Sequence, residues 1–399
     1  MEDILKKSKR IDKIRSLKAL FCALFLISLL FGVSEFILRK FTSFGNTLNN
    51  VEYYASIAFT EEERKTAIKA REDFASIGER LVGVPGTVVF HYKKARTDSF
   101  NFNSFGFRGE EPQKKEENEY RIAVFGDSRI LGILFVEENT IPFVMQKRLQ
   151  EEFPDKKITV FNIGIEGYDL QRAAPLAELS AEKLELDMAV FYTAIVDINN
   201  SFLRGNIDYE PFKPNESVGE VMIENIEGNK KRPFLQRSAV IKVISETFYN
   251  DSVQKSGSFE KDADFVPLIP EFVARADELL AKFKARAKKV SDNLGVKGIK
   301  SVFFIPPFLQ LKEPLSAAEY KVLYRNEMAV QGLNSFVVYF EKGISESKDP
   351  VMFKQSYLFS GYSETMFYDG IHYIPKSAKL VGNNMAERVI PLMKEYFKK

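Results

Sequence analysis

The sequence predicts an α/β protein: a three-layer α/β/α sandwich around a five-stranded parallel, doubly wound (flavodoxin-like) sheet, plus one N-terminal transmembrane helix. Two observations predict the sheet. Short apolar runs rich in β-branched and aromatic residues recur along the chain, and stretches of helical length separate them. Strands that alternate with helices at this spacing pair in parallel. A twenty-residue apolar stretch at 19–38 matches one helical crossing of a bilayer.

Length and composition set the outer limits. At 399 residues, with 45% hydrophobic residues, the chain can form one large α/β domain with additions. The net charge of the chain is +2, of which residues 1–40 carry +5, so residues 41–399 carry −3. A slightly acidic segment lacks the excess of Lys and Arg that nucleic-acid binding requires. The single cysteine, Cys22, excludes a disulfide within the chain and Cys-based metal sites. We expect neither a metal nor a cofactor.

The N-terminus carries the signals of a membrane anchor. Seven Lys or Arg residues in a basic tail at 1–18 precede the apolar stretch, whose only charge is Glu35. This bias predicts a cytoplasmic N-terminus and an extracytoplasmic body, in the periplasm or at the cell surface. A cleaved signal peptide is the alternative, with Gly32-Val33-Ser34 as small residues before Glu35. The length of the apolar run favours an uncleaved single-pass anchor.

Residues 39–119 are interpreted as a connector and an N-terminal extension. Thr60 and Glu63 resemble a capping box, and they predict a helix that runs to about Leu81. A β-like run follows at 87–92, and we expect His91 within it to be a structural or surface residue.

Residues 120–399 show the alternation of strands and helices and form the predicted catalytic domain. An insertion at 202–268, with one expected helix at 234–249, interrupts the alternation. It is either a candidate lid or specificity element, or a surface excursion without a role in the site. The expected strands are 121–125, 158–162, 187–193, 299–305 and 351–353; the expected helices are 141–152, 170–184, 271–293, 317–340 and a last one from Pro375.

The first candidate site residue is Ser128. Gly126-Asp127-Ser128 follows the first of these strands, at the point where the chain has to turn. A serine there lies at the carboxyl end of a parallel strand, which is where open α/β sheets bind their ligands. The tripeptide by itself is a weak signal.

The second candidate is the turn that contains Asp369 and His372. The chain has only two histidines, so chemistry that depends on histidine has to use His91 or His372. A carboxylate three residues before a histidine can accept a hydrogen bond from Nδ1–H, which leaves Nε2 to take a proton from a serine. In a doubly wound sheet this loop reaches the same edge as Ser128, so we expect the two side chains to meet.

Three short blocks follow one another along the chain: Gly126-Asp127-Ser128 with Gly132, Asn162-Ile163-Gly164-Ile165-Glu166-Gly167, and Asp369-Gly370-Ile371-His372. Together they resemble the SGNH/GDSL-type hydrolases. The resemblance implies that Ser128 is the nucleophile, that His372 is the general base oriented by Asp369, and that the Ser128 and Gly167 N–H groups form an oxyanion hole. A preceding Asn-x-x-Gly-Phe-Arg stretch at 103–108 is also seen in extracytoplasmic members.

The chain departs from that family at two positions. Val196 stands where the third block, Gly-x-Asn-Asp, has the asparagine that donates to the oxyanion. Loss of such a donor can cost about 2.7–4 kcal/mol of transition-state stabilisation. Asn199 or Asn200, one turn further on, are candidate replacements. Arg129 is the other unusual residue, either a binding group for an anionic substrate or the partner of a nearby carboxylate.

Three functional hypotheses follow. The leading one is a serine esterase that acts on an O-acyl group of an envelope glycan or lipid. The second is an O-acetyltransferase that modifies a surface polysaccharide with the same three residues. The third is a scaffold of an envelope assembly with weakened chemistry, which a long distance between Ser128 and His372 would favour. The sequence names no protein partner.

Overall fold

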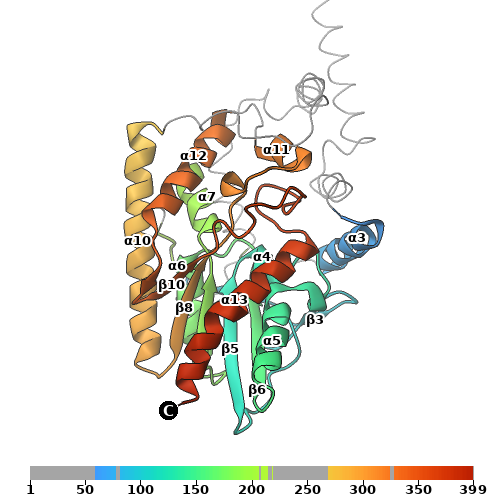
Figure 1. The fold of residues 1–399 in the computed structure, drawn as a ribbon. Coiled ribbons are helices and arrows are strands. Elements are labelled where there is room, and N and C mark those ends of the chain that lie inside the picture. Colours follow the sequence, from blue (N-terminus) through green and yellow to red (C-terminus); the bar gives the residue numbers. More distant parts are fainter. Residues whose placement is uncertain are drawn as a thin grey trace, which may run out of the picture. The chain divides into compact units, whose positions relative to one another are not determined.

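A parallel sheet forms the centre of the structure, a computed structural model that describes residues 59–77, 81–205, 208–213, 218, 268–323 and 328–398 (Figure 1). Five strands run parallel, and their order in the sheet, numbered along the chain, is 2-1-3-4-5. This is the flavodoxin-like order that the sequence predicts. From one edge inward the strands are β6 (Lys157–Gly164), β5 (Glu119–Gly126), β7 (Met188–Tyr192), β8 (Lys300–Ile305) and β10 (Val351–Lys354).

The prediction of five strands is wrong by one. A sixth strand, β9 (Ser347–Lys348), pairs antiparallel with β10 at the edge of the sheet. It has only two residues, both exposed, so it carries none of the apolar alternation from which a strand can be predicted. The sheet is therefore mostly parallel, with one short antiparallel edge strand.

Helices cover both faces of the sheet (Figure 1). One layer contains α5 (Ile141–Glu152) and α13 (Pro375–Tyr396), which pack against each other. The second layer packs around the long helix α10; its members are α6 (Leu170–Ala181), α7 (Ile195–Arg204), α10 (Pro270–Gly295) and α12 (Met328–Gly343). This division follows from the handedness of the connections. The chain first runs from β5 outward to β6, and then crosses back over β5 to β7. Because each crossover between parallel strands is right-handed, connections in opposite directions place their helices on opposite faces of the sheet.

Several helix boundaries differ from the prediction. Helix α3 (Glu61–Ser76) has the expected capping box at Thr60 but ends before Leu81, because β1 (Leu81–Gly83) pairs there with β2 (Phe90–Tyr92). The single helix expected at 317–340 is two helices, α11 (Ala317–Leu323) and α12. In both segments apolar residues recur at helical spacing, so the sequence pattern does not show where the first helix ends. The expected helix at 234–249 lies outside the described residues.

The predicted membrane segment at 19–38 also lies outside the described residues. Within the ranges given above, no helix is both long and apolar enough to span a bilayer.

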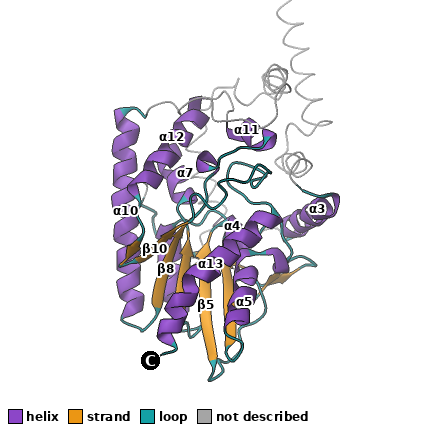
Figure 2. Cartoon of the chain, viewed as in Figure 1, coloured by secondary structure: helices purple, strands orange, loops and turns teal. Residues whose placement is uncertain are grey.

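The carboxyl ends of the strands carry the loops and short helices that form the candidate site. Figure 2 shows these loops gathered beyond one end of the strands. The short helix α4 (Ser128–Leu131) follows β5, and α7 follows β7. Two 3-10 helices, η2 (Glu137–Asn139) and η4 (Leu309–Leu311), complete the elements of this region.

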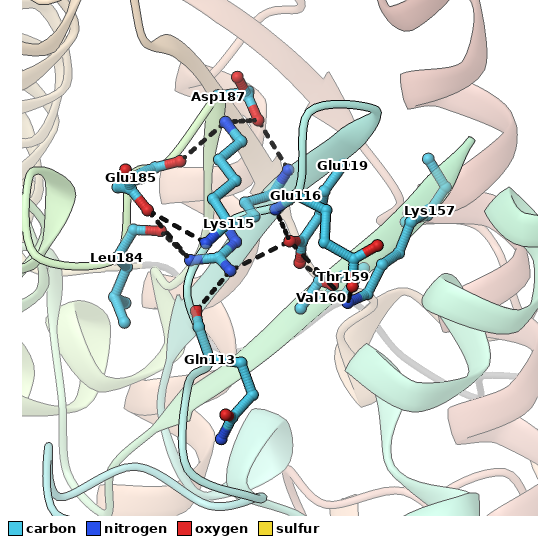
Figure 3. A network of polar contacts seen from close by, with 12 residues as sticks. Gln113, Lys115, Glu116, Glu119, Lys157, Thr159, Val160, Leu184, Glu185 and Asp187 are labelled. Atoms are coloured by element: carbon cyan, nitrogen blue, oxygen red, sulfur yellow. Dashed lines mark hydrogen bonds and ion pairs between the residues drawn. The ribbon is translucent and has the colours of Figure 1, made fainter.

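A buried ion pair stabilises the opposite, amino-terminal end of the sheet (Figure 3). The Arg121 guanidinium of β5 donates to the Glu119 carboxylate at 3.0 Å and to the carbonyls of Gln113 and Leu184. Burial raises the pKa of Glu119, but hydrogen bonds from Arg121 and Thr159 outweigh burial and lower it to about 2. Because both side chains of the pair are almost fully buried, neither can exchange its partner for water.

We predict that Arg121→Met destabilises the protein by about 3 kcal/mol, because the variant leaves the Glu119 carboxylate buried without its partner. The Thr159 hydroxyl and the Glu116 N–H would still donate to the carboxylate, but among the described residues the one cation left within 4.0 Å would be Lys157, whose side chain is partly exposed. Urea unfolding measures the change, with Arg96→Met as the control, since Arg96 pairs with Glu110 at the surface and its loss should cost under about 1 kcal/mol. Equal destabilisation by the two variants would contradict the prediction.

Candidate active site

Ser128 lies in a tight turn that only a glycine at position 126 permits. Asp127 caps α4 with its side chain, and Ser128 is the first residue of the helix. A Cβ atom on Gly126 would lie 2.5 Å from the Ile130 side chain and 2.6 Å from the Tyr192 carbonyl oxygen. The turn therefore packs directly on the end of β7 and holds Ser128 at the carboxyl edge of the sheet.

Ser128, His372 and Asp369 form a continuous chain of hydrogen bonds. Ser128 Oγ lies 2.8 Å from His372 Nε2, and His372 Nδ1 lies 2.8 Å from Asp369 Oδ2. Asp369 Oδ1 also accepts the N–H groups of Ile371 and His372, at 2.8 and 2.7 Å, so the turn itself fixes the carboxylate. With Nδ1–H donating to Asp369, Nε2 is left to accept the Ser128 hydroxyl proton.

The charges of the pair shift both pKa values. Burial raises the pKa of Asp369, but the His372 charge and the hydrogen bonds to the carboxylate outweigh this and hold it below its ordinary value. Burial lowers the pKa of His372, but Asp369 outweighs it, so the net shift is upward. The Tyr368 ring stacks on the imidazole, with centroids 5.5 Å apart. Asp369 is thus ionised at neutral pH and suited to stabilise an imidazolium.

The loop after β6 brings Gly167 into the same region. Gly167 has a φ of 71°, which favours glycine. Within the described residues, neither the Ser128 N–H nor the Gly167 N–H donates a hydrogen bond to a protein acceptor. The loop packs closely on α4, because a Cβ on Gly164 would lie 2.0 Å from the Leu131 nitrogen. Two main-chain donors are therefore available for a ligand.

The turn after β7 has an uncommon backbone conformation at Ala194, whose φ of 90° lies in a region that favours glycine. Asp197, three residues on, accepts the N–H groups of Ala194 and Leu170. Burial and the charge of Asp169 raise the pKa of Asp197 to about 7. Asp197 thus ties α7 to the start of α6, a role that the sequence analysis did not foresee.

The candidate replacements for the missing asparagine have different surroundings. Asn200 donates its side-chain amide to the Tyr209 hydroxyl at 2.9 Å and to Asp169 at 3.4 Å. The Asn199 Oδ1 atom is buried without a hydrogen-bond partner. No hydrogen bond of the described residues joins either side chain to Ser128 or Gly167.

Arg129 has the ion-pair surroundings that were one of its two predicted alternatives. Its guanidinium donates to both carboxylate oxygens of Asp127, at 2.9 and 2.6 Å, and only 3% of Arg129 is exposed. It also donates to the Tyr373 hydroxyl at 3.4 Å, and that hydroxyl lies 2.7 Å from the Tyr192 hydroxyl. In the sequence, Arg129 stood out because it directly follows Ser128. Nothing in the sequence indicated that Tyr192 and Tyr373 would lie beside it.

Comparisons with known proteins found similarity in three-dimensional structure but no match in sequence. No protein-family model matches the chain, and no curated protein matches it. An acetyl xylan esterase, AlAXEase, is 13% identical with a TM-score of 0.36, over 67% of this chain and 99% of its own. LAE5, an α/β hydrolase enzyme from the metagenome of Lake Arreo, Spain, is 12% identical with a TM-score of 0.34, over 67% of this chain and 94% of its own.

A lipolytic protein of the G-D-S-L family from Desulfitobacterium hafniense DCB-2 is 11% identical with a TM-score of 0.33, over 67% of this chain and 98% of its own. At these identities and TM-scores, the function of this chain has to follow from its own site.

Proposed function

We propose that this protein is a serine esterase of the SGNH/GDSL type that cleaves an O-acyl ester. The observation that carries the proposal is the continuous hydrogen-bonded chain from Ser128 through His372 to Asp369. The two unpaired N–H groups of Ser128 and Gly167 support it, because an acyl transfer needs donors for a developing oxyanion. The 2.8 Å between Ser128 and His372 speaks against the scaffold hypothesis, which a long distance would have favoured.

The proposed reaction begins when Ser128 Oγ attacks the ester carbonyl carbon and passes its proton to His372 Nε2. The carbonyl oxygen becomes an oxyanion, and the N–H groups of Ser128 and Gly167 stabilise it. His372 then protonates the leaving alkoxide, and an acyl group stays on Ser128. Water, deprotonated by His372, attacks this acyl-enzyme; as the bond between the acyl carbon and Ser128 Oγ breaks, His372 returns the proton to Oγ and the acid is released. Asp369 remains ionised throughout and stabilises the imidazolium.

We further propose that the substrate is an O-acylated glycan or lipid of the cell envelope. This step depends on the sequence prediction that residues 19–38 anchor the chain, with its body outside the cytoplasm. Incubation with an acetylated envelope glycan tests the class of substrate and the direction of the reaction together. Free acetate indicates hydrolysis, whereas acetate that moves to a second glycan indicates acyl transfer.

Labelling with a fluorophosphonate tests the nucleophile. We expect the wild-type protein and a Ser345→Ala control, altered at an exposed position, to be labelled, and Ser128→Ala to remain unlabelled. Labelling that survives in Ser128→Ala would exclude Ser128 as the nucleophile.

Val196→Asn tests whether the oxyanion site lacks a donor. We predict that the variant raises kcat by about tenfold or more, because an added donor can recover part of the 10²–10³ that such a group contributes. Val196 is only partly buried, so the asparagine amide would not be sealed from water and the fold should tolerate it. Steady-state hydrolysis of 4-nitrophenyl acetate measures the effect, and Val196→Ala, which adds no donor, is the matched control. An asparagine variant no faster than the alanine variant would contradict the prediction.

A further inference from the structure

The loop that carries Gly167 is held from outside by β2 of the N-terminal extension. The Tyr92 hydroxyl accepts the Glu166 N–H at 3.2 Å. On the other side of Gly167, the Tyr168 hydroxyl donates to the Phe90 carbonyl and accepts the Phe90 N–H at 3.0 Å. Phe90, Tyr92 and Tyr168 are all buried. The residues that flank Gly167 on both sides are therefore bound to one short strand.

Arg108 of the same extension holds the helix that begins at Ser128. Its guanidinium, on a residue only 2% exposed, donates to the carbonyls of Leu131 and Gly132 at 2.8 Å and of Phe135 at 2.7 Å. These carbonyls lie at the end of α4 and just beyond it, where a helix has no further N–H groups of its own to donate to them. A side chain from outside the sheet thus fixes the far end of the Ser128 helix.

Internal contacts make this segment rigid enough to act as a support. The rings of Tyr92 and Phe102 stack with centroids 4.2 Å apart. Asn103 Oδ1 accepts two main-chain N–H groups of the following turn. Gly106, with a φ of 78°, lets that turn pack on β2, since a Cβ there would lie 2.4 Å from the His91 ring. Arg108 also forms an antiparallel bridge to Asn162 on the edge strand β6.

We propose that residues 90–108 position the two main-chain donors of the oxyanion hole, with Tyr92 and Arg108 as positioning residues. The inference rests on the proposed function. With Val196 in place of an asparagine, both remaining donors belong to the backbone, so their geometry depends on what holds the Gly167 loop and α4. Displacing a catalytic group by about 1 Å can cost up to 10² in rate. The Asn-x-x-Gly-Phe-Arg stretch then has a specific purpose: it ends in the arginine that supports the Ser128 helix.

Tyr92→Phe tests this support, because it removes the acceptor of the Glu166 N–H and keeps the ring. We expect kcat for 4-nitrophenyl acetate to fall about tenfold with KM unchanged, since a displaced oxyanion donor weakens transition-state binding alone. We also expect the Tyr168 and Leu170 amide protons of the loop to exchange with deuterium several times faster. Tyr339→Phe, which removes a hydroxyl contact between α12 and α10, is the matched control and should change neither quantity.

The outcomes separate this inference from the proposed function. A wild-type protein that neither hydrolyses esters nor reacts with a fluorophosphonate would overturn the proposed function, and the catalytic role of the support with it. An active wild-type protein with an equally active Tyr92→Phe variant would overturn the inference alone. A Tyr92→Phe variant with a lower kcat and a higher KM, but with unchanged hydrogen exchange of the loop amides, would also overturn the inference.

Discussion

Replacing His372 by alanine is expected to lower kcat for ester hydrolysis by a factor of about 10⁵ to 10⁶. Without the imidazole, nothing at 2.8 Å from Ser128 Oγ can take the hydroxyl proton or return it to the leaving group. The remaining rate would come from substrate binding and the two N–H donors. Steady-state kinetics with 4-nitrophenyl acetate, on protein checked for cooperative unfolding, measures the loss.

Added imidazole provides an internal control for this variant. His372 is partly exposed, with 19% of its side chain accessible, so a free imidazole can reach the space that alanine leaves. We expect imidazole to restore part of the activity of His372→Ala and to leave Ser128→Ala inactive. A His372→Ala variant that keeps more than a tenth of the wild-type rate would exclude histidine as the general base.

The fold followed from the sequence wherever an element is long enough to show a period. The five parallel strands are apolar runs, and the helices between them are long, so the order of elements and the flavodoxin-like sheet were predictable. The sixth strand was not, because two exposed residues, Ser347 and Lys348, carry no pattern. Helix α7 was missed for a different reason. It begins at a strained Ala194 and carries two asparagines, which are poor helix formers.

The candidate site also has one part that could be predicted from the sequence and one part that could not. Ser128, Asp369 and His372 could be chosen from the sequence, because the chain has only two histidines and the Asp–His turn is local. The structure brings these three together. The contacts of Arg108, Tyr92 and Tyr373 could not be predicted, because each depends on how distant segments pack.

Asp369→Asn is expected to lower kcat by about 10⁴, although the geometry of the turn should survive. An asparagine Oδ1 can still accept the N–H groups of Ile371 and His372, which hold the turn in the wild-type protein. Its amide can donate to Nδ1, however, which moves the imidazole proton to Nε2. That nitrogen then cannot accept the Ser128 proton. Kinetics over a range of pH values measure this loss and a second effect.

The second effect is a shift in the pH dependence. In the wild-type protein Asp369 outweighs burial and raises the pKa of His372 above 6.5, so kcat/KM should increase with pH as His372 loses its proton, with an apparent pKa above 6.5. In Asp369→Asn the negative charge is gone and burial remains, so the pKa falls and the increase moves to lower pH. Asp292→Asn, which removes a carboxylate from a surface ion pair with Lys288, is the control and should show the wild-type profile. An unchanged profile in Asp369→Asn would mean that Asp369 does not set the protonation of the base.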